Sequence, residues 1–285
     1  MNFWITQLFN GFSYGALIFL LAMGLSLIFG VMQVINVTHG TYFLVGTYVG
    51  LTILMTTGNF YLAMLGGALV IALVGILIER FFLRRLRGND LGQVLITFGF
   101  VLLLQDAILL IWGPDPKLMA EPKSISFTAN IGGFTFPSYR LFVIAVAAAV
   151  AAGLWLFENK TKFGSAVRAA VDDVEMASGM GVDVPRVFTV VFGLGAFLAG
   201  LGGVLSGPWL GLQYGLDLEI LPYAFVVVIV GGMGSLKGAV LASLIVGLVD
   251  NFGKGFFPEF AYFTLFLPMA VILAVRPQGL FGRTL

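Results

Sequence analysis

The chain has 285 residues, of which 59% are hydrophobic and only 10% are charged. A soluble domain typically carries about 25% charged residues, so this chain has too few charges to coat a water-facing surface. The same composition excludes intrinsic disorder, which requires low hydrophobicity and high charge. The formal net charge of +1 gives no electrostatic basis for binding nucleic acid. Cysteine is absent, which excludes disulfides, thiolate metal sites and a cysteine nucleophile.

Long apolar runs dominate the chain from its first residues onward. A helix needs roughly 17–25 apolar residues to cross a bilayer, and five segments qualify: 8–29, 60–78, 91–112, 141–157 and 187–205. Four shorter runs need flanking residues, a tilt or a broken, re-entrant arrangement: 41–55, 220–230, 239–249 and 262–275. No ten-residue strand alternation recurs. The sequence therefore predicts an all-α polytopic transmembrane bundle with broken or re-entrant short helices and about 8–9 spans, in one domain covering residues 1–285.

The break at residues 33–40 is the first interruption of an apolar run. It contains the polar residues Asn36, Thr38 and His39, followed by Gly40. Polar groups at membrane depth usually face a bundle interior or a cavity and often mark a pathway. A loop at the membrane boundary would explain the same residues. His39 is the only histidine and has no carboxylate nearby in sequence, so a metal or catalytic role is not expected.

The distribution of Lys and Arg predicts the orientation. The densest basic cluster follows the third apolar run and comprises Arg80, Arg84, Arg85 and Arg87. Short loops on the cytoplasmic side of a membrane protein carry an excess of Lys and Arg, so we place this cluster in the cytoplasm. Successive crossings then place the N-terminus outside, the C-terminus inside, and 11 of the 15 basic residues inside. This scheme requires residues 220–249 to cross twice or not at all, and the glycine-rich interruption at 231–238 favours two short limbs joined by a tight turn.

A polar pair interrupts the fourth run at Gln105 and Asp106. A carboxylate at the bilayer centre costs about 2.5–3.5 kcal/mol on insertion scales. Asp106 lies six residues before Trp112, so we expect the pair to line a cavity or its rim.

Small residues recur at four-residue steps along the fifth long run, at Gly195, Ala199, Gly203 and Gly207. Small residues at this spacing let helices approach closely, so we interpret them as packing positions.

The insert at residues 158–186 contains an amphipathic helix pattern. Apolar residues recur at helical spacing from Val167 to Val174, Ser165 is a candidate N-cap, and Gly179 and Gly181 end the pattern. Two interpretations stay open: the helix docks into a groove on a soluble partner, or it rests on the membrane interface.

Nucleotide, metal and hydrolase motifs are absent. The sequence contains no G-x-x-x-x-G-K-[ST], no H-E-x-x-H and no G-x-S-x-G. We therefore expect no metal or cofactor on this chain and no enzymatic activity, and the chain is not itself an ATPase of the phosphate-loop type.

Several stretches together resemble the permeases of branched-chain amino-acid ABC transporters. Residues 30–40 (GVMQVINVTHG) and 46–48 (GTY) resemble the family's GVxxxINxAHG…GAY region, with Thr38 where alanine is commoner. Residues 168–182 resemble its cytoplasmic coupling segment, and 231–239 (GGMGSLKGA) and 276–282 (RPQGLFG) resemble its C-terminal signatures. The resemblance covers roughly residues 8–283, and the size suits the shorter, H-type permease. The family also includes urea and amide permeases, so the solute does not follow from it.

The resemblance implies a multi-pass subunit of a bacterial inner-membrane importer that carries a small solute, with branched-chain or related amino acids favoured. It implies three kinds of partner protein: a second homologous permease, two cytoplasmic ATPases that hold ATP and Mg, and a periplasmic binding protein. It also implies that the chain is embedded in the lipid membrane. It assigns ATPase coupling to Arg168, Asp172, Glu175, Gly179 and Gly181. We further expect the two apolar breaks to supply hinges and pathway walls, through Asn36, Thr38, His39, Gly40, Gly231, Gly232, Gly234 and Ser235.

Three alternatives stay open at this point. An ion-coupled secondary transporter or channel would use Asp106 and the broken segments, and it would transport without companion proteins. An intramembrane enzyme would need a nucleophile or metal constellation that the sequence does not provide. A scaffold that only anchors partners would leave the polar break at 36–40 without a role.

Overall fold

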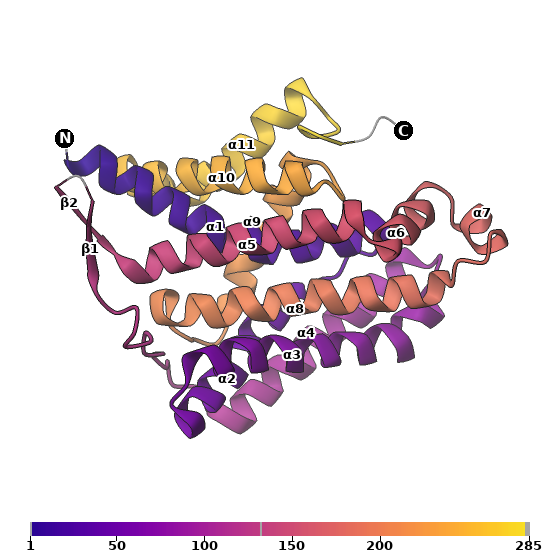
Figure 1. Cartoon of the computed structure of the whole chain (residues 1–285), viewed down its shortest axis with the longest axis horizontal. Coiled ribbons are helices and arrows are strands. Elements are labelled where there is room, and N and C mark those ends of the chain that lie inside the picture. The colour runs from indigo at the N-terminus through magenta and orange to yellow at the C-terminus, as the bar shows by residue number, and fades with distance from the viewer. Residues whose placement is uncertain (1, 132, 283–285) are drawn as a thin grey trace.

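The computed structural model describes residues 2–131 and 133–282, and within them the chain forms a bundle of long helices with one small hairpin (Figure 1). The helices are α1 (Asn2–Met32), α2 (His39–Thr57), α3 (Phe60–Phe81), α4 (Asp90–Trp112), α5 (Ser138–Lys160), α6 (Lys162–Asp172), α7 (Val174–Gly179), α8 (Val184–Leu210), α9 (Leu216–Gly231), α10 (Leu236–Phe256) and α11 (Ala261–Val275). Two 3₁₀ turns, Leu83–Leu86 and Pro258–Phe260, and the antiparallel strands β1 (Thr128–Ile131) and β2 (Phe134–Pro137) complete the described elements.

Seven helices in the described part of the chain are long and apolar enough to cross a membrane: α1, α2, α3, α4, α5, α8 and α10. The helices α9 and α11 are shorter, with 16 and 15 residues. The prediction of an all-α polytopic bundle with additional short helices is therefore confirmed.

The bundle has two distinct ends (Figure 1). The N-terminus and the β1–β2 hairpin lie at one, here called the hairpin end, and α6 and α7 lie at the other, called the α6–α7 end. The loop after α3 belongs to the α6–α7 end, because Arg80 and Arg84 line a shared pocket with Asp183 and Arg186 at the start of α8. At the hairpin end, Arg140 donates a hydrogen bond to Asn10. The arginines Arg80, Arg84 and Arg186 therefore lie at the opposite end of the bundle from Arg140.

The centre of the bundle is packed through small residues on α1, α2 and α8. A Cβ atom built on Gly46 of α2 would lie 2.6 Å from the Gly200 Cα of α8. A Cβ on Gly203 would collide with the Phe43 carbonyl oxygen. Helices in lipid associate by such close packing, since hydrocarbon offers no hydrophobic drive between them. The prediction that the four-residue steps are packing positions is confirmed.

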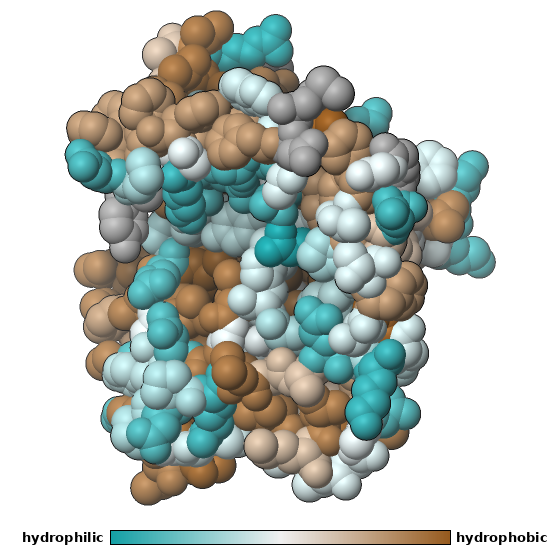
Figure 2. Space-filling view, turned by 90° about the vertical axis from the view of Figure 1, so that its left-hand side faces the viewer, coloured by the Kyte–Doolittle hydropathy of each residue, from teal (hydrophilic) through white to brown (hydrophobic). Residues whose placement is uncertain are grey.

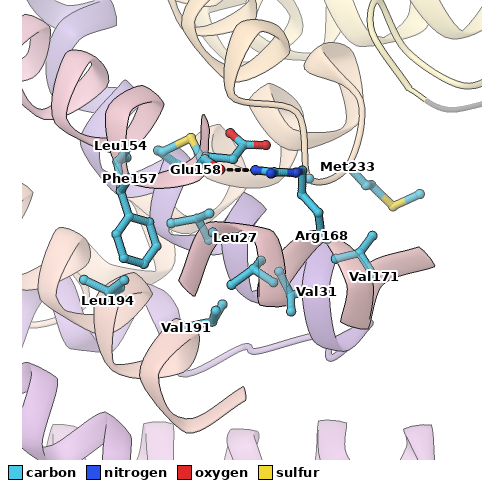
Figure 3. A pocket seen from close by; sticks show the side chains of 15 residues that line it. Leu27, Val31, Leu154, Phe157, Glu158, Arg168, Val171, Val191, Leu194 and Met233 are labelled. Carbon is cyan, nitrogen blue, oxygen red and sulfur yellow. Dashed lines mark hydrogen bonds between the residues drawn. The ribbon is translucent and has the colours of Figure 1, made fainter. Parts of the chain in front are cut away.

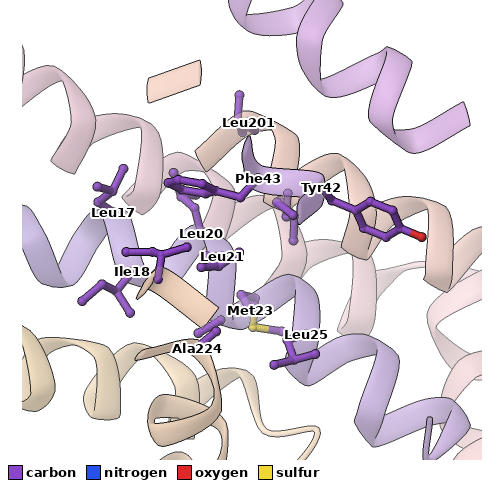
Figure 4. Packing of buried hydrophobic residues seen from close by; sticks show 14 of the residues in the cluster. Leu17, Ile18, Leu20, Leu21, Met23, Leu25, Tyr42, Phe43, Leu201 and Ala224 are labelled. Atoms are coloured by element: carbon purple, nitrogen blue, oxygen red, sulfur yellow. The ribbon is translucent and has the colours of Figure 1, made fainter. Parts of the chain in front are cut away.

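Large apolar side chains fill the space that these contacts leave (Figure 4). Leu17, Leu20 and Leu21 of α1 lie against Phe43 of α2, and all four are almost completely buried. The opposite pattern holds for α4 and α5, where few residues of the apolar stretch are buried. The helices α4 and α5 therefore form the periphery, where an apolar surface suits lipid.

Helix α9 crosses the direction of the long helices between α8 and α10 (Figure 1). Its first turn meets α2, since a Cβ on Gly40 would lie 2.5 Å from the Asp217 carbonyl oxygen. Its middle meets α1, where the Tyr223 and Tyr14 rings are 5.7 Å apart. Its end meets α10, where Gly231 packs against Gly238. This single short helix thus links three longer ones.

A tight turn at residues 232–235 joins α9 to α10. Gly232 and Gly234 have φ angles of 92° and 74°, a region that L-residues with side chains rarely adopt. Ser235 then caps α10 by accepting a hydrogen bond from the Gly238 amide at 3.0 Å. The turn supports the interpretation of residues 220–249 as two limbs.

Candidate functional site

Part of the linker between α1 and α2 lies inside the bundle, whereas Gln33 and Ile35 are exposed. Asn36, Thr38 and His39 each have 0% exposed surface. The Thr38 hydroxyl donates to the Thr97 carbonyl at 2.7 Å, and His39 Nε2 lies 2.9 Å from the Leu21 carbonyl oxygen. These bonds tie the linker to α4 and to the middle of α1. These three polar residues therefore lie in the protein interior.

A buried carboxylate stands next to this linker. Asp217, in the first turn of α9, is 1% exposed, and its Oδ2 accepts hydrogen bonds from Thr41 Oγ1 and Gln105 Nε2, each at 2.8 Å. Three helices, α2, α4 and α9, meet at this oxygen. We call Asn36, Thr38, His39, Tyr42, Thr41, Gln105 and Asp217 the interior junction.

The interior junction also holds most of the buried polar atoms that lack a partner. Among the described residues these atoms are Asn36 Nδ2, Asn36 Oδ1, His39 Nδ1, Tyr42 OH, Asp217 Oδ1 and, away from the junction, Arg84 Nε. An unpaired buried polar group costs about 1–3 kcal/mol, and native structures hold few of them. All but the Arg84 atom belong to the α1–α2 linker, to the first turn of α2 or to Asp217 of the adjoining α9, which makes the surroundings of this segment a functional candidate.

The structure separates the two polar residues of α4. Gln105 is buried and joins the junction, whereas its neighbour Asp106 is exposed on the outer side of the helix. Sequence reasoning did not identify Asp217, since it precedes the apolar run 220–230 in a stretch that reads as an external loop. The available signal is an acidic residue two positions after Gly215, in what reads as the first turn of a helix.

A second polar cluster lies toward the hairpin end and was also missed. Lys254 Nζ forms a 2.7 Å ion pair with Asp250 Oδ2 and donates to the Tyr223 hydroxyl at 3.1 Å. That hydroxyl donates to Asp250 Oδ1 at 3.1 Å, and Lys254 lies 5.5 Å from the Tyr14 ring centroid. The cluster ties α1, α9 and α10 together. Figure 2 looks onto this end of the molecule, where hydrophilic residues alternate with hydrophobic ones.

The predicted amphipathic helix is two helices, α6 and α7, separated at Asp173. Thr161, not Ser165, caps α6, because the Thr161 hydroxyl accepts a hydrogen bond from the Gly164 amide at 2.9 Å. The predicted cap was therefore wrong by four residues. The predicted apolar face is also only partly correct: Val167 is buried, whereas Val174 lies beyond the break and is exposed.

The residues assigned to coupling form an exposed surface at the α6–α7 end. Asp172, Glu175, Gly179 and Gly181 are all exposed. Two large apolar side chains accompany them, Met176 at 65% and Met180 at 79% exposed. Arg168 differs, because it is partly buried and donates hydrogen bonds to the Glu158 carbonyl and to Ser165 Oγ. The surface is thus attached to the end of α5.

The turn at residues 231–235 lies apart from the interior junction, against the last part of α1. The Gly234 amide donates to Ser26 Oγ at 3.2 Å, and a Cβ on Gly234 would lie 2.9 Å from the Gly30 Cα. The C-terminal stretch folds back here, with the Phe281 amide donating to the Gly231 carbonyl at 3.0 Å. The two predicted hinge segments thus contact α1 at different places.

A buried glutamate connects the α3–α4 loop to α8 at the α6–α7 end of the bundle. Glu79 accepts a 2.6 Å hydrogen bond from Thr189 Oγ1 and forms a 3.3 Å ion pair with Arg87. The Arg87 guanidinium in turn lies 4.5 Å from the Phe188 ring centroid. No group of three or more His, Asp or Glu residues that could hold a metal ion occurs within residues 2–131 and 133–282.

Comparison with known families places the chain. Residues 7–276 match the model of the branched-chain amino acid transport system permease component. The chain belongs to this family. It is therefore a multi-pass membrane permease. Three stretches resemble family signatures: GVMQVINVTHG spans the α1–α2 linker, GGMGSLKGA spans the α9–α10 turn, and RPQGLFG, at residues 276–282 after α11, packs against that turn.

Full-length relatives support the assignment. The chain is 29% identical to the high-affinity branched-chain amino acid permease BraD of Pseudomonas aeruginosa over 98% of this chain and 96% of that protein. It is 29% identical to the permease LivH of Escherichia coli over 99% and 96%, and 26% identical to LivM of the same species over 93% and 68%. Among solved structures, PsaBC from Streptococcus pneumoniae in complex with Fab is similar at a TM-score of 0.48, with 16% identity over 93% of this chain and 89% of that one.

Proposed function

We propose that the chain is one membrane subunit of an ABC importer for a branched-chain or related amino acid. A periplasmic binding protein delivers the solute, a second homologous permease completes the pathway, and two separate ATPases supply the energy. The exposed surface of α6 and α7 carries this proposal. Its methionines and acidic residues point away from the bundle, and a flexible, methionine-bearing surface suits docking into a groove on a soluble partner.

The charge distribution supports the orientation. The basic residues Arg80, Arg84 and Arg186 gather near the α6–α7 end, and cytoplasmic loops carry the excess of Lys and Arg. We therefore assign the α6–α7 end to the cytoplasm and the hairpin end to the periplasm, in a bacterial inner membrane. Force from an ATPase would then reach α5 through Arg168 and α8 through the short connection after α7.

The interior junction supplies the candidate pathway. Its unpaired polar atoms, on Asn36, His39, Tyr42 and Asp217, are groups that a polar solute can satisfy in passing. The pathway is closed in the present arrangement because α9 packs directly against α2, a contact that Gly40 permits since it has no side chain. We propose that α9 withdraws from α2 when the pathway opens, with the turn at 232–235 as its pivot.

Reconstitution tests the proposal. Proteoliposomes that contain this chain, its companion permease and both ATPases should accumulate leucine only with ATP inside and the binding protein outside. Omission of any one component should abolish accumulation. Accumulation without ATP would contradict the proposal.

One observation favours the alternative of an ion-coupled carrier. Asp217 is a buried carboxylate with a free oxygen, which is the kind of group that binds a coupling proton or sodium ion. The alternative predicts uptake by this chain alone, driven by a proton or sodium gradient. Proteoliposomes of the purified chain, assayed with and without each gradient, distinguish the two functions.

A further inference from the structure

A pocket lies between α6 and the helices α1, α5 and α8 (Figure 3). Four helices supply its apolar walls: Leu27 and Val31 of α1, Leu154 and Phe157 of α5, Val167 and Val171 of α6, and Val191 and Leu194 of α8. Met233, in the α9–α10 turn, closes one side. The pocket is thus partly enclosed, and its lining is aliphatic except for one aromatic ring.

Two charged residues stand along one side of this aliphatic lining (Figure 3). Arg168 donates from Nη1 to the Glu158 carbonyl and from Nη2 to Ser165 Oγ, which leaves several of its five N–H groups for another acceptor. The Glu158 carboxylate forms no ion pair with the described residues. A cationic and an anionic group therefore both border the pocket with hydrogen-bonding capacity to spare.

We propose that this pocket binds a free aliphatic amino acid that enters from the α6–α7 end. The guanidinium of Arg168 takes the carboxylate of the ligand, for which its planar donor pair is suited. Glu158 takes the ammonium group, and the branched side chain occupies the space between Leu27, Val191 and Leu194. A fatty acid would satisfy Arg168 but leave Glu158 without a partner, and a long acyl chain does not suit a pocket enclosed by four helices.

Occupation of this pocket has a mechanical consequence. A ligand in this pocket contacts α6 and, at the same time, α1, α5 and α8. If α6 moves away, these contacts are lost, so the ligand binds only the present conformation and stabilises it by its free energy of binding. Under the proposed function, on which this step rests, α6 transmits the ATPase movement. The accumulated solute would therefore slow its own import from the cytoplasmic side.

Equilibrium binding of radiolabelled leucine to the full-length chain in phosphatidylcholine nanodiscs tests the site. The wild type should bind leucine saturably. Leu194→Trp, which fills the pocket, and Arg168→Gln, which removes the cation, should each weaken binding about tenfold or more. Leu156→Trp is the matched control, because Leu156 is on α5 but half exposed outside the pocket. Thermal unfolding of each variant checks the fold, and Val171→Phe is a second filling variant should Leu194→Trp unfold.

Three results would overturn the proposal: no saturable leucine binding by the wild type, unchanged binding in both filling variants, or displacement of leucine by phosphatidylethanolamine, which would assign the pocket to lipid. Each leaves the proposed import function standing. Conversely, a failure of ATP-driven uptake in the complete reconstituted system would contradict the import function without affecting leucine binding. In that system, leucine preloaded inside the vesicles should slow uptake by the wild type and not by Leu194→Trp.

Discussion

The interior junction and the α6–α7 segment are both rich in polar residues, but they are built in opposite ways. At the junction, Thr41, Gln105 and Asp217 are held among close helix contacts with almost no exposed surface. On α7, Glu175 and Met176 are exposed, and within α7 only Ala177 is buried. The first region depends on fit among helices of the same chain, whereas α7 exposes most of its side chains at the surface, where another molecule can reach them. Substitutions should therefore act on stability in the first region and on partner binding in the second.

The largest effect is expected where α2 and α8 touch. Gly203→Leu places a side chain against the Phe43 carbonyl, which belongs to the backbone and cannot move aside. Overpacking typically costs about 1–3 kcal/mol and occasionally more, and here we expect little folded protein. Fluorescence-detected size-exclusion chromatography measures the folded fraction. Gly153→Leu on α5 is the control, because nothing lies within 4 Å of its built Cβ, and equal loss in both variants would show that the central contact is not special.

The next effect concerns two neighbours on α4. Gln105→Leu removes one of the two donors to the buried Asp217 carboxylate, so we expect a loss of about 1–3 kcal/mol in the free energy of unfolding. Asp106→Leu, one residue later and exposed, should change it by about 0.5 kcal/mol or less. Thermal unfolding in detergent compares the two variants.

A double variant separates the bond from the packing. Gln105→Leu combined with Asp217→Leu leaves no buried carboxylate to satisfy, so the combined loss should be smaller than the sum of the single losses. Strictly additive losses would show that the hydrogen bond contributes nothing.

The sequence predicts well those features that depend on local composition, and it misses those that depend on contacts between distant parts of the chain. The long helices follow from hydrophobic runs, and the packing glycines follow from their four-residue spacing, because both depend on local composition. Asp217 is different. Its significance comes from Thr41 and Gln105, which lie 176 and 112 residues away in the chain. Hydropathy assigns it to a loop, and only the crossing path of α9 brings it inside.

The error at α6 has a local cause. Thr161 and Ser165 are both suitable N-caps and are four residues, or about one helical turn, apart, so pattern alone does not separate them. The break at Asp173 has a similar origin, since Asp172 and Asp173 read as a solvent-exposed face of a single helix. In the structure Asp173 has an extended backbone, with a φ of −158°, and caps α7.

Partner binding should depend on the exposed methionines of the α7 region. Met176→Glu together with Met180→Glu replaces the two large apolar side chains of this surface by charged ones, and because both positions are exposed the unfolding temperature should stay the same. Co-purification with the ATPase subunits should fall about tenfold, along with ATP-driven uptake. Met55→Glu is the control, since Met55 is 75% exposed near the end of α2, toward the hairpin end. Retained co-purification in the double variant would contradict the docking role of α7.

The smallest effect tests whether α7 must be helical to serve as that surface. Asp173 Oδ1 accepts a hydrogen bond from the Met176 amide at 2.9 Å, and loss of such a cap costs about 1 kcal/mol. Because α7 has only six residues, Asp173→Ala should fray it without unfolding the bundle, and Asp173→Asn should restore most of the helix. Hydrogen exchange of the α7 amides measures the fraying. If uptake falls only in the alanine variant, a folded α7 is part of the coupling surface, whereas faster exchange with unchanged uptake would mean that the partner itself orders this helix on binding.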